Sequence, residues 1–544
     1  MTPDQFQHYP DNFAHKHLPK IEDQPEYLCP DGFPQFGEYL NCAHRLLDSH
    51  IENGKGDSIC LRSDNAVWTY QKLHDIANKI AHHLVHDLHL VPGNRVLLRS
   101  ANNPMVVACW YGVIKAGGVV VTTMPLLRTK ELNTIINCAE ISHALCDNRL
   151  REELEATDTK FLKHLSFFDG LEKECFSLEE AIEKYDSNFD NFKSKPNTVA
   201  LIGFTSGTTG LPKMTAHYHS DILNICEAFP RYSLQPKTED VFIGSPPIGF
   251  TFGLGGLVLF PMYYGASSFM LEKPSPDNIL AAIQEFKVSI CFTAPTAWRV
   301  IQTKIADYDI SSLRKCISAG ETLSVQIWEE WYRSTGLKII DGIGATEMLH
   351  IFISSNEDNM KPGATGLAMP GYEAKVVNDA GDEVEPNTIG KLAVKGITGC
   401  KYLNRPDKQS DYVQNGWNIT GDLFKRDEDG YFWYVARGDD MIISSGYNIA
   451  AIEVENVLLS HDNVLECAVT GIPDSERGML VCAAIVLKDK VKASNDLAKE
   501  IQDWFKNNAA PYKYPRKICF VDALPKTQTG KVQRFRLKEK LLED

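Results

Sequence analysis

The chain has 544 residues, of which 43% are hydrophobic and 23% are charged, and this ordinary globular composition excludes a disordered chain. The 56 Lys and Arg against 71 Asp and Glu give a formal charge of −15, which disfavours nucleic acid or an anionic membrane as a partner. The length allows roughly three or four folding units with cores that need no disulfides.

Helical and β-branched segments alternate over much of the chain, which is typical of an α/β protein with mostly parallel sheets. An amphipathic helix is predicted over 73–88, and a second, apolar helix over 106–117. The predicted strands of this part cover residues 95–100, 119–124, 287–295, 313–320 and 337–344.

Residues 241–271 contain no charged side chain, and their length alone would permit a transmembrane helix. Six glycines and three prolines interrupt the segment, so no clean apolar run of about 20 residues survives. We therefore expect a loop and a buried helix beside an uncharged pocket, and no membrane span.

After residue 375 the alternation of helical and β-branched segments gives way to short strands with close turns, which predicts a small β subdomain. Beyond Asp439 a compact pattern follows: a helix from Ala451, strands at 466–472 and 481–487, and a helix from Asn495. We predict a large N-terminal domain, 1–438, of mostly parallel βα subdomains plus the β subdomain, and a small α+β domain, 439–544.

The 14 cysteines are scattered and form no CxxC pair, so we expect buried thiols in a reducing compartment. The N-terminus lacks the apolar core of a signal peptide and is too acidic for a transit peptide. These features predict a cytoplasmic protein.

The segment IGFTSGTTGLPK, 202–213, carries the strongest local signal. An apolar strand runs into dense hydroxyls and glycines, which can cradle phosphate oxygens, and a lysine can neutralise their charge. It is not a Walker A loop, and the alternative is a flexible surface loop. The candidate phosphate-binding residues are Thr205, Ser206, Gly207, Thr208, Thr209 and Lys213.

This segment resembles the signature loop of the adenylate-forming superfamily, which contains acyl-CoA synthetases, adenylation domains and luciferases. Four further blocks resemble that family in the same order. They are Gly344-Ala345-Thr346-Glu347, Thr420-Gly421-Asp422, Arg437 within ARGDDMIISSGYNI, and Lys531 within LPKTQTGKVQR.

The resemblance implies a role for each block. Thr346 meets phosphate, Glu347 holds Mg²⁺, and Lys531 is the catalytic lysine of a mobile lid domain. Asp439 is the hinge of that lid. Asp422 binds the ribose hydroxyls, and Arg437 also reaches the ribose. The remaining nucleotide-site and CoA-site residues that the resemblance implies are Gly320, Glu321, Asp341, Gly342 and, lining the pantetheine tunnel, Gly446.

The implied reaction has two steps on one site. A carboxylate attacks the α-phosphorus of ATP, giving an acyl-adenylate and pyrophosphate. The lid then rotates and the thiol of CoA displaces AMP. Residues 511–540 carry nine Lys or Arg and two acids, a patch that suits CoA, although ATP binding or a solvated helix end explains it equally well.

The acid-binding segments resemble those of benzoate and 2-aminobenzoate CoA ligases, in GFTFGLGG (249–256), GATEMLHIF (344–352) and TGCKYL (398–403). We therefore expect an ATP-dependent aryl-CoA ligase whose partners are an aromatic carboxylate, ATP and CoA, with a homodimer allowed. The alternatives are a medium-chain acyl-CoA synthetase and, more weakly, a carrier-loading adenylation domain or a luciferase. The implied acyl-pocket residues are Phe250, Thr251, Phe252, Gly344, His350 and Ile351, although a core role for His350 is the competing interpretation.

Overall fold

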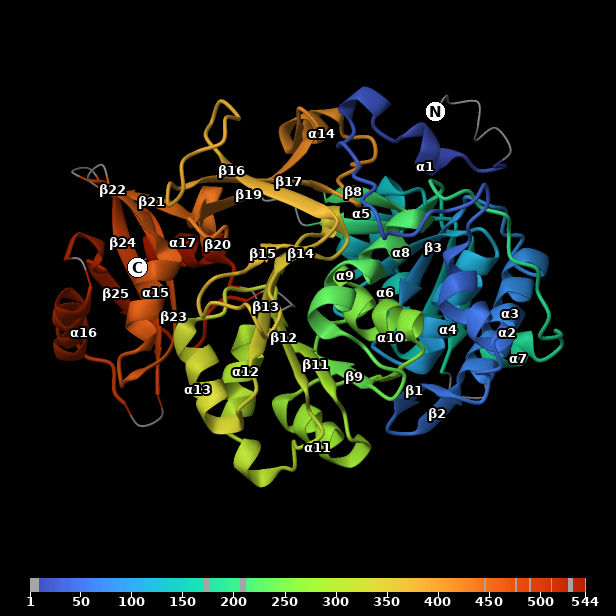
Figure 1. Cartoon of the computed structure of the whole chain (residues 1–544), viewed down its shortest axis with the longest axis horizontal. Coiled ribbons are helices and arrows are strands. Elements are labelled where there is room, and N and C mark those ends of the chain that lie inside the picture. Colours follow the sequence, from blue (N-terminus) through green and yellow to red (C-terminus); the bar gives the residue numbers. More distant parts are fainter. Residues whose placement is uncertain are drawn as a thin grey trace.

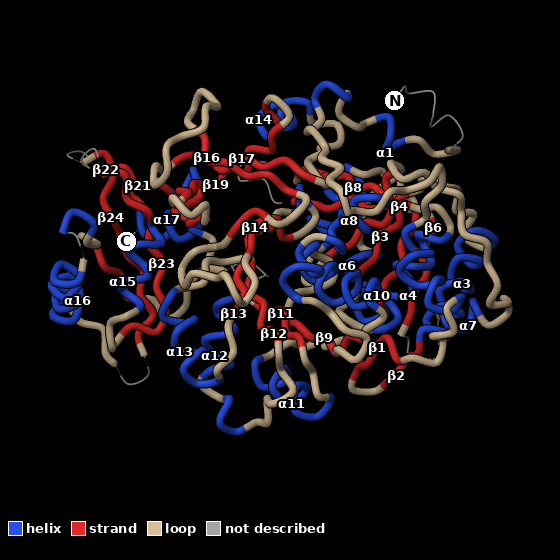
Figure 2. Tube along the Cα trace, viewed as in Figure 1, coloured by secondary structure: helices blue, strands red, loops and turns tan. Residues whose placement is uncertain are grey.

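A computed structural model describes residues 9–169, 177–205, 212–444, 447–474, 477–488, 491–509, 511–526 and 532–543. The chain forms a mixed α/β fold in which two parallel-rich sheets and an antiparallel sheet precede a C-terminal unit with its own sheet (Figure 1). Figure 2 shows the strands at the centre with helices around them.

The first sheet has six strands, and every neighbouring pair is parallel except the last, β7–β8. All five residues of β3 are buried because helices cover this kind of sheet on both faces. In sheet order the strands are β6 (His164–Phe168), β5 (His143–Asp147), β3 (Arg95–Arg99), β4 (Val119–Thr123), β7 (Val199–Thr205) and β8 (Lys213–Tyr218).

The second sheet has nine strands and is parallel from β13 through to β1. Its C-terminal strand ends carry several of the predicted site residues. In sheet order the strands are β15 (Leu367–Ala368), β14 (Ile351–Ser354), β13 (Ile339–Gly344), β12 (Lys315–Ala319), β11 (Ile290–Thr293), β9 (Val241–Gly244), β10 (Ser267–Phe269), β1 (Ile59–Ser63) and β2 (Ala66–Thr69).

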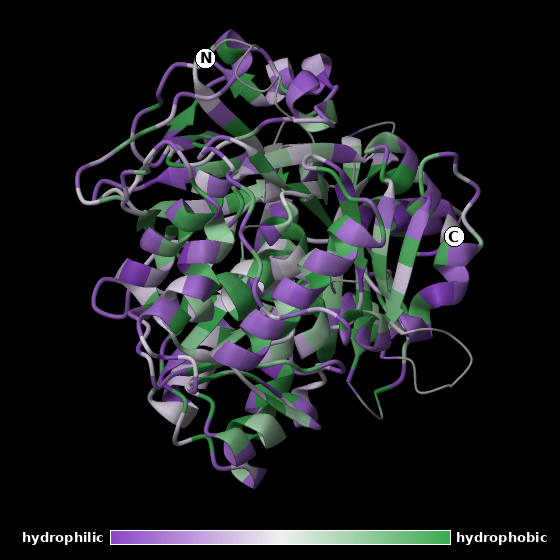
Figure 3. Ribbon diagram, turned by 90° about the vertical axis from the view of Figure 1, so that its right-hand side faces the viewer, coloured by the Kyte–Doolittle hydropathy of each residue, from purple (hydrophilic) through white to green (hydrophobic). Residues whose placement is uncertain are grey.

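Two helices show how local sequence sets the packing. The amphipathic α3 (Tyr70–His86) starts where the Thr69 side chain accepts a hydrogen bond from the Lys72 backbone. α4 (Pro104–Lys115) starts with an Asn103 cap and a proline, and all of its residues are buried. Figure 3 shows purple and green faces on the outer helices, with green concentrated inside.

The uncharged segment folds as β9, a buried helical stretch and β10. The helical stretch comprises α9 (Thr251–Leu254), the π-helix η6 (Gly255–Leu259) and α10 (Phe260–Tyr264). The prediction of a buried helix is therefore confirmed. No helix within the described ranges combines the length and apolarity needed to cross a bilayer.

The predicted β subdomain is confirmed as an antiparallel sheet. Its strands are β16 (Tyr372–Val377), β17 (Gly390–Gly396), β18 (Val413–Gln414), β19 (Trp417–Arg426) and β20 (Phe432–Arg437).

The C-terminal unit lies at one side of the molecule (Figure 1). Its mostly antiparallel sheet packs against three helices, and it includes the helices and strands predicted from the sequence. The boundary at 438–440 stays a prediction. The elements are β21 (Met441–Ser444), β22 (Tyr447–Ala450), α15 (Ala451–Leu459), β23 (Val464–Asp474), β24 (Gly478–Leu487), α16 (Asn495–Asn508), β25 (Lys517–Phe520) and α17 (Arg534–Glu543).

Most of the described cysteines are buried, and each of them carries a free thiol. This distribution matches the expectation of buried thiols that act as small apolar side chains.

Candidate active site

The predicted phosphate loop begins and ends on paired strands. Thr205, the last residue of β7, lies directly opposite Lys213, the first residue of β8. The Thr205 Oγ1 atom is buried and has no hydrogen-bond partner among the described residues. A buried hydroxyl without a partner is costly, so this atom is available to a ligand. Ser206, Gly207, Thr208 and Thr209 lie outside the described residues.

The Tyr402 hydroxyl connects Lys213 to Glu347 by two hydrogen bonds. The Lys213 Nζ atom donates to the Tyr402 hydroxyl at 2.7 Å, and that hydroxyl donates to Glu347 Oε1 at 2.5 Å. Lys213 Nζ also lies 3.8 Å from Glu347 Oε1 and 4.6 Å from the centre of the Tyr402 ring. The Glu347 carboxylate is thus buried, and the Tyr402 phenol and the Lys213 ammonium stabilise its charge.

Thr346 joins this group from the short 3₁₀-helix η8 (Thr346–Met348), which follows β13. Its methyl group packs on Gly203 of β7, where an added Cβ atom would come within 2.7 Å of Thr346 Cγ2. Only glycine allows this close approach. The structure therefore brings together Thr205, Lys213, Thr346 and Glu347, which the sequence placed in two separate blocks.

Tyr402 was missed as a site residue. It lies in the TGCKYL segment, whose resemblance to the 2-aminobenzoate CoA ligases assigns the tyrosine no chemical role. Burial first, and then the charge of Glu347, raise the pKa of Tyr402, so the phenol stays protonated and acts as a donor.

The predicted nucleotide residues lie at two adjacent strand ends. Ala319 of β12 pairs with Gly342 of β13, so Gly320 and Glu321 follow next to Asp341 and Gly342. The Oδ1 atom of Asp341 is buried without a hydrogen-bond partner in the described part of the chain, and burial raises the pKa of this carboxyl well above its usual range. This polar atom can meet a donor on a ligand.

Asp422 and Arg437 lie opposite each other on β19 and β20. Arg437 Nε is 3.8 Å from Asp422 Oδ1, and the arginine side chain is half exposed. The carboxylate can accept a hydrogen bond from one hydroxyl, and the exposed guanidinium beside it can donate one to a second hydroxyl. This geometry suits the ribose role that the resemblance implies.

His350 lies in a cluster of aromatic rings. Its ring centre is 4.5 Å from that of Phe260 and 5.7 Å from that of Phe252. Burial lowers the pKa of His350 to about 3, so the imidazole is neutral at physiological pH. The Nε2 atom approaches the Phe252 carbonyl oxygen at 3.4 Å, and the buried Nδ1 atom has no partner among the described residues.

The helical stretch that begins at Thr251, directly after Phe250, carries two glycines that pack against the rings of His350 and Phe292. A Cβ atom at Gly255 would lie 2.6 Å from His350 Nε2, and one at Gly256 would lie 2.8 Å from Phe292 Cδ1. Gly344 and Ile351 pair across β13 and β14, next to His350. The structure therefore brings the predicted acyl-pocket residues to one place, and it makes His350 a buried side chain with an unused nitrogen.

The structure does not describe the side chains of three residues that the resemblance assigns to the lid. Lys531 and Gly446 lie outside the described residues, and so does the side chain of Asp439, whose backbone belongs to the 3₁₀-helix η9 (Gly438–Asp440). Their roles stay predictions.

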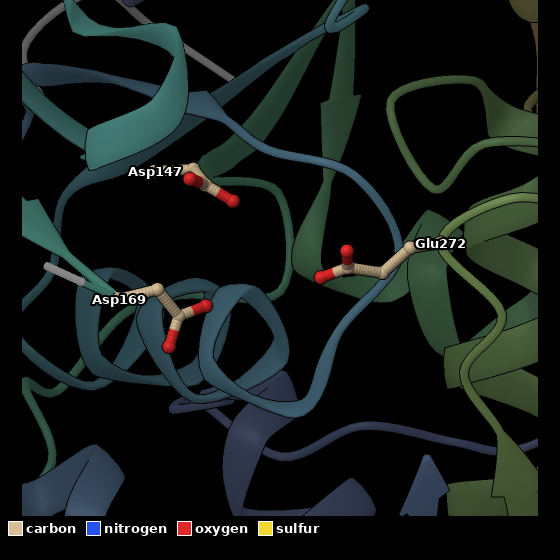
Figure 4. Close-up of side chains that lie close together, drawn as sticks. All are labelled: Asp147, Asp169 and Glu272. Atoms are coloured by element: carbon tan, nitrogen blue, oxygen red, sulfur yellow. The ribbon is translucent and has the colours of Figure 1, made fainter. Parts of the chain in front are cut away.

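A second group of carboxylates, Asp147, Asp169 and Glu272, converges near the ends of β5, β6 and β10 (Figure 4). Arg149 Nε donates to Asp147 Oδ1 at 2.9 Å, and Arg149 Nη1 donates to Glu272 Oε2 at 2.7 Å. Burial raises the pKa of Asp169 to about 6. The guanidinium compensates this negative charge, so we interpret the group as an ion-pair cluster that joins the two large sheets.

Comparison with known proteins matches two family models. Residues 48–401 match the AMP-binding enzyme model, and residues 453–531 match the model of the AMP-binding enzyme C-terminal domain. The benzoate–CoA ligase of Thauera aromatica is 31% identical over 520 residues, covering 92% of this chain and 96% of that protein. The mitochondrial acyl-coenzyme A synthetase ACSM3 of Homo sapiens is 31% identical over 526 residues, covering 92% and 90%.

A solved structure shares the whole architecture. It is the crystal structure of the anthranilate CoA ligase AuaEII in complex with anthranoyl-AMP, which is 31% identical to this chain. The TM-score is 0.89, with 93% of this chain and 99% of that chain covered.

Proposed function

We propose that this chain activates an aromatic carboxylate of the benzoate or 2-aminobenzoate type. The chain belongs to the AMP-binding enzyme family and is an acid–thiol ligase. In this reaction the acid and ATP give an aryl-adenylate and pyrophosphate. The thiol of CoA then attacks the adenylate carbonyl, forming the thioester and releasing AMP.

The observation that carries the aromatic substrate is the ring wall around His350. His350 packs on Gly255 of the α9–η6 stretch, and its ring lies beside those of Phe252 and Phe260. The wall is therefore made of flat rings. A planar ring fits such a wall edge-to-face, whereas an eight-carbon chain needs greater depth. Two similar proteins are named as ligases of benzoate and of anthranilate, which supports this choice.

The polar atoms of the pocket favour a ring with a donor substituent. His350 is neutral, and its Nε2 atom is directed at a carbonyl oxygen, so Nε2 carries the proton. The buried Nδ1 atom is then an acceptor without a partner among the described side chains. An amino or hydroxyl group on the ring could satisfy it, which supports 2-aminobenzoate or a hydroxybenzoate over benzoate.

The first step must bring two anions together. Lys213, fixed by Tyr402, supplies positive charge beside the phosphate loop, and the Thr205 hydroxyl, which has no partner among the described residues, supplies a donor. The buried Asp341 Oδ1 atom is an acceptor available to the amino group of adenine. Asp422 and Arg437 would hold the ribose hydroxyls.

The residues present also fit Mg²⁺. Glu347 offers a buried carboxylate, whose orientation Tyr402 holds, and Mg²⁺ in nucleotide sites uses one or two carboxylates together with phosphate oxygens. When bound, the ion would neutralise phosphate charge. Lys213 keeps the carboxylate from facing the phosphates as an uncompensated anion.

Both steps need the C-terminal unit. Lys531 would stabilise the adenylation transition state, and rotation about Asp439 would then bring Gly446 to the pantetheine tunnel. In the structure, Arg299 of α12 (Pro295–Gln302) donates to the Leu465 carbonyl at 2.9 Å and lies 3.4 Å from Glu466, both on β23. These polar contacts between the two units can break and re-form when the lid moves.

A medium-chain acyl-CoA synthetase is the second candidate, because the similarity to the acyl-coenzyme A synthetase ACSM3 is equally strong. A homodimer and a cytoplasmic location stay predictions from the sequence.

The deciding experiment measures AMP release with benzoate, 2-aminobenzoate, hydroxybenzoates, hexanoate and octanoate, with and without CoA. We expect the highest kcat/KM with a substituted benzoate and full turnover only with CoA. A higher kcat/KM with octanoate would reject the aromatic proposal and select the medium-chain alternative.

A further inference from the structure

A surface cavity of about 570 Å³ opens in the N-terminal domain, apart from every residue assigned above to ATP, the acid or CoA. It lies where η3 (His44–Asp48) and α2 (Ser49–Glu52) meet the end of α8 (His219–Glu227) and α10. Its charged and aromatic lining residues include Arg45, His50, Lys55, Glu227, Arg231 and Tyr263.

The charge of this lining is unbalanced. Arg45, Lys55 and Arg231 are exposed cations, and Glu227 is the single carboxylate of the lining. Glu227 is already engaged, because its Oε2 atom pairs with Arg231 at 3.1 Å and its Oε1 atom accepts a hydrogen bond from Tyr263. Arg45 and Lys55 have no carboxylate partner among the described residues. The lining of the cavity therefore carries a net positive charge, although the whole chain has a net charge of −15.

One of the unpaired cations is held in place. The Arg45 guanidinium lies 4.6 Å from the centre of the Tyr263 ring, and this stacking contact orients its plane while leaving its N–H groups without a hydrogen-bond acceptor among the described residues. His50 donates from Nε2 to the Met262 carbonyl at 2.6 Å, and burial lowers the pKa of its imidazole. The histidine is thus a neutral wall beside two cations.

From this arrangement we propose that the cavity binds a small phosphate monoester. Two cations without a carboxylate partner among the described residues, one of them oriented by a ring, match a dianion better than a single carboxylate. The volume falls in the range of small-molecule sites and exceeds what a bare phosphate ion fills, so the organic part of the ligand lies against the polar and tyrosine walls. This site is additional to the ligase centre and does not depend on the proposed aromatic substrate.

Calorimetric titration of the full chain with inorganic phosphate and with glucose 6-phosphate at low ionic strength tests the site. We expect saturable binding that weakens about tenfold in Arg45→Gln and in Lys55→Gln, which is the effect of losing one charge-assisted contact. Arg45→Lys keeps the charge but loses the planar guanidinium that stacks on Tyr263, so binding should weaken less than in Arg45→Gln. Glu227→Gln removes the negative charge and should tighten binding, a change that a merely structural defect would not cause.

The matched control is Lys163→Gln, an exposed lysine on another part of the domain, which should bind as the unmodified chain does. Binding that persists unchanged in the Arg45→Gln/Lys55→Gln double variant would place phosphate at the ligase centre and overturn the proposal. Absence of saturable binding to the unmodified chain would overturn it as well. AMP release by the double variant should be unchanged. The phosphate-binding proposal and the proposed aromatic substrate can therefore each be rejected without rejecting the other.

Discussion

Tyr402 and Glu347 are joined by a hydrogen bond of 2.5 Å from the phenol to the carboxylate, and the same phenol accepts from Lys213. The three side chains come from three different parts of the chain and converge beside the phosphate loop. Tyr402 is therefore a positioning residue: it fixes the carboxylate proposed to hold Mg²⁺ and the lysine proposed to face phosphate.

Tyr402→Phe should keep the fold and the ring stacking on Lys213 but release both partners. We expect kcat for adenylate formation to fall by about tenfold or more and the Mg²⁺ concentration for half-maximal rate to rise, because Glu347 loses its orientation. Pyrophosphate release at varied Mg²⁺ measures both quantities. Tyr372→Phe removes another buried phenol, which contacts Thr398 at 2.8 Å, and should leave the Mg²⁺ dependence unchanged. Equal Mg²⁺ curves for all three proteins would contradict the role of Tyr402.

Lys531→Ala should abolish adenylate formation, because the lysine is proposed to stabilise the charge that develops when carboxylate meets ATP. Thioester synthesis from supplied aryl-adenylate should continue. Pyrophosphate release and CoA consumption measure the two halves separately. Lys499→Ala, an exposed lysine on α16 outside the 511–540 patch, is the control and should be normal in both. Equal loss of both half-reactions in Lys531→Ala would argue against this assignment.

Gly446→Trp should spare pyrophosphate release and block CoA transfer, because a bulky side chain would fill the proposed pantetheine tunnel. Single-turnover measurements with and without CoA distinguish the steps. Gly37→Trp, at an exposed position where an added Cβ meets nothing within 4 Å and φ is not positive, controls for a general effect of a new tryptophan. Normal turnover of Gly446→Trp with CoA would remove this residue from the tunnel.

Asp341 predicts a pH effect on stability. Burial raises its pKa in the folded state, so between the ordinary carboxyl pKa and the raised one the folded chain binds more protons than the unfolded chain. The free energy of unfolding therefore falls as the pH rises through this window. Asp341→Asn should lack that loss and be more stable than the unmodified chain at pH 7, while its KM for ATP rises. Urea denaturation at several pH values checks this, and equal slopes for both proteins would contradict it.

The Lys401–Asp221 ion pair is fully buried, with Nζ and Oδ2 separated by 2.9 Å and a further hydrogen bond from Nζ to the Tyr27 hydroxyl at 2.6 Å. Lys401→Met would leave a buried carboxylate without its partner and should cost about 3–5 kcal/mol of unfolding free energy. The double variant Lys401→Met/Asp221→Asn removes both charges and should recover part of that loss. Urea denaturation measures both. A single variant as stable as the unmodified chain would refute the importance of the pair.

The sequence by itself determined the family, the fold class and the elements whose patterns are local. The strand and helix periods of 95–124 and of the C-terminal unit were predicted because alternation and amphipathicity are properties of neighbouring residues. The phosphate loop and the acyl segment were also found, because each is a short continuous motif.

Only the tertiary structure decided which of these pieces act together. Tyr402 is 189 positions from Lys213 and 55 from Glu347, so no local pattern could assign it a role. The contact of His350 with Gly255 and the stacking of Arg45 on Tyr263 also join distant positions, so no local pattern predicts them. Such contacts depend on how the sheets and helices pack. That packing is set by the burial of the whole core, whereas composition and net charge average over the chain and conceal a local cluster of cations.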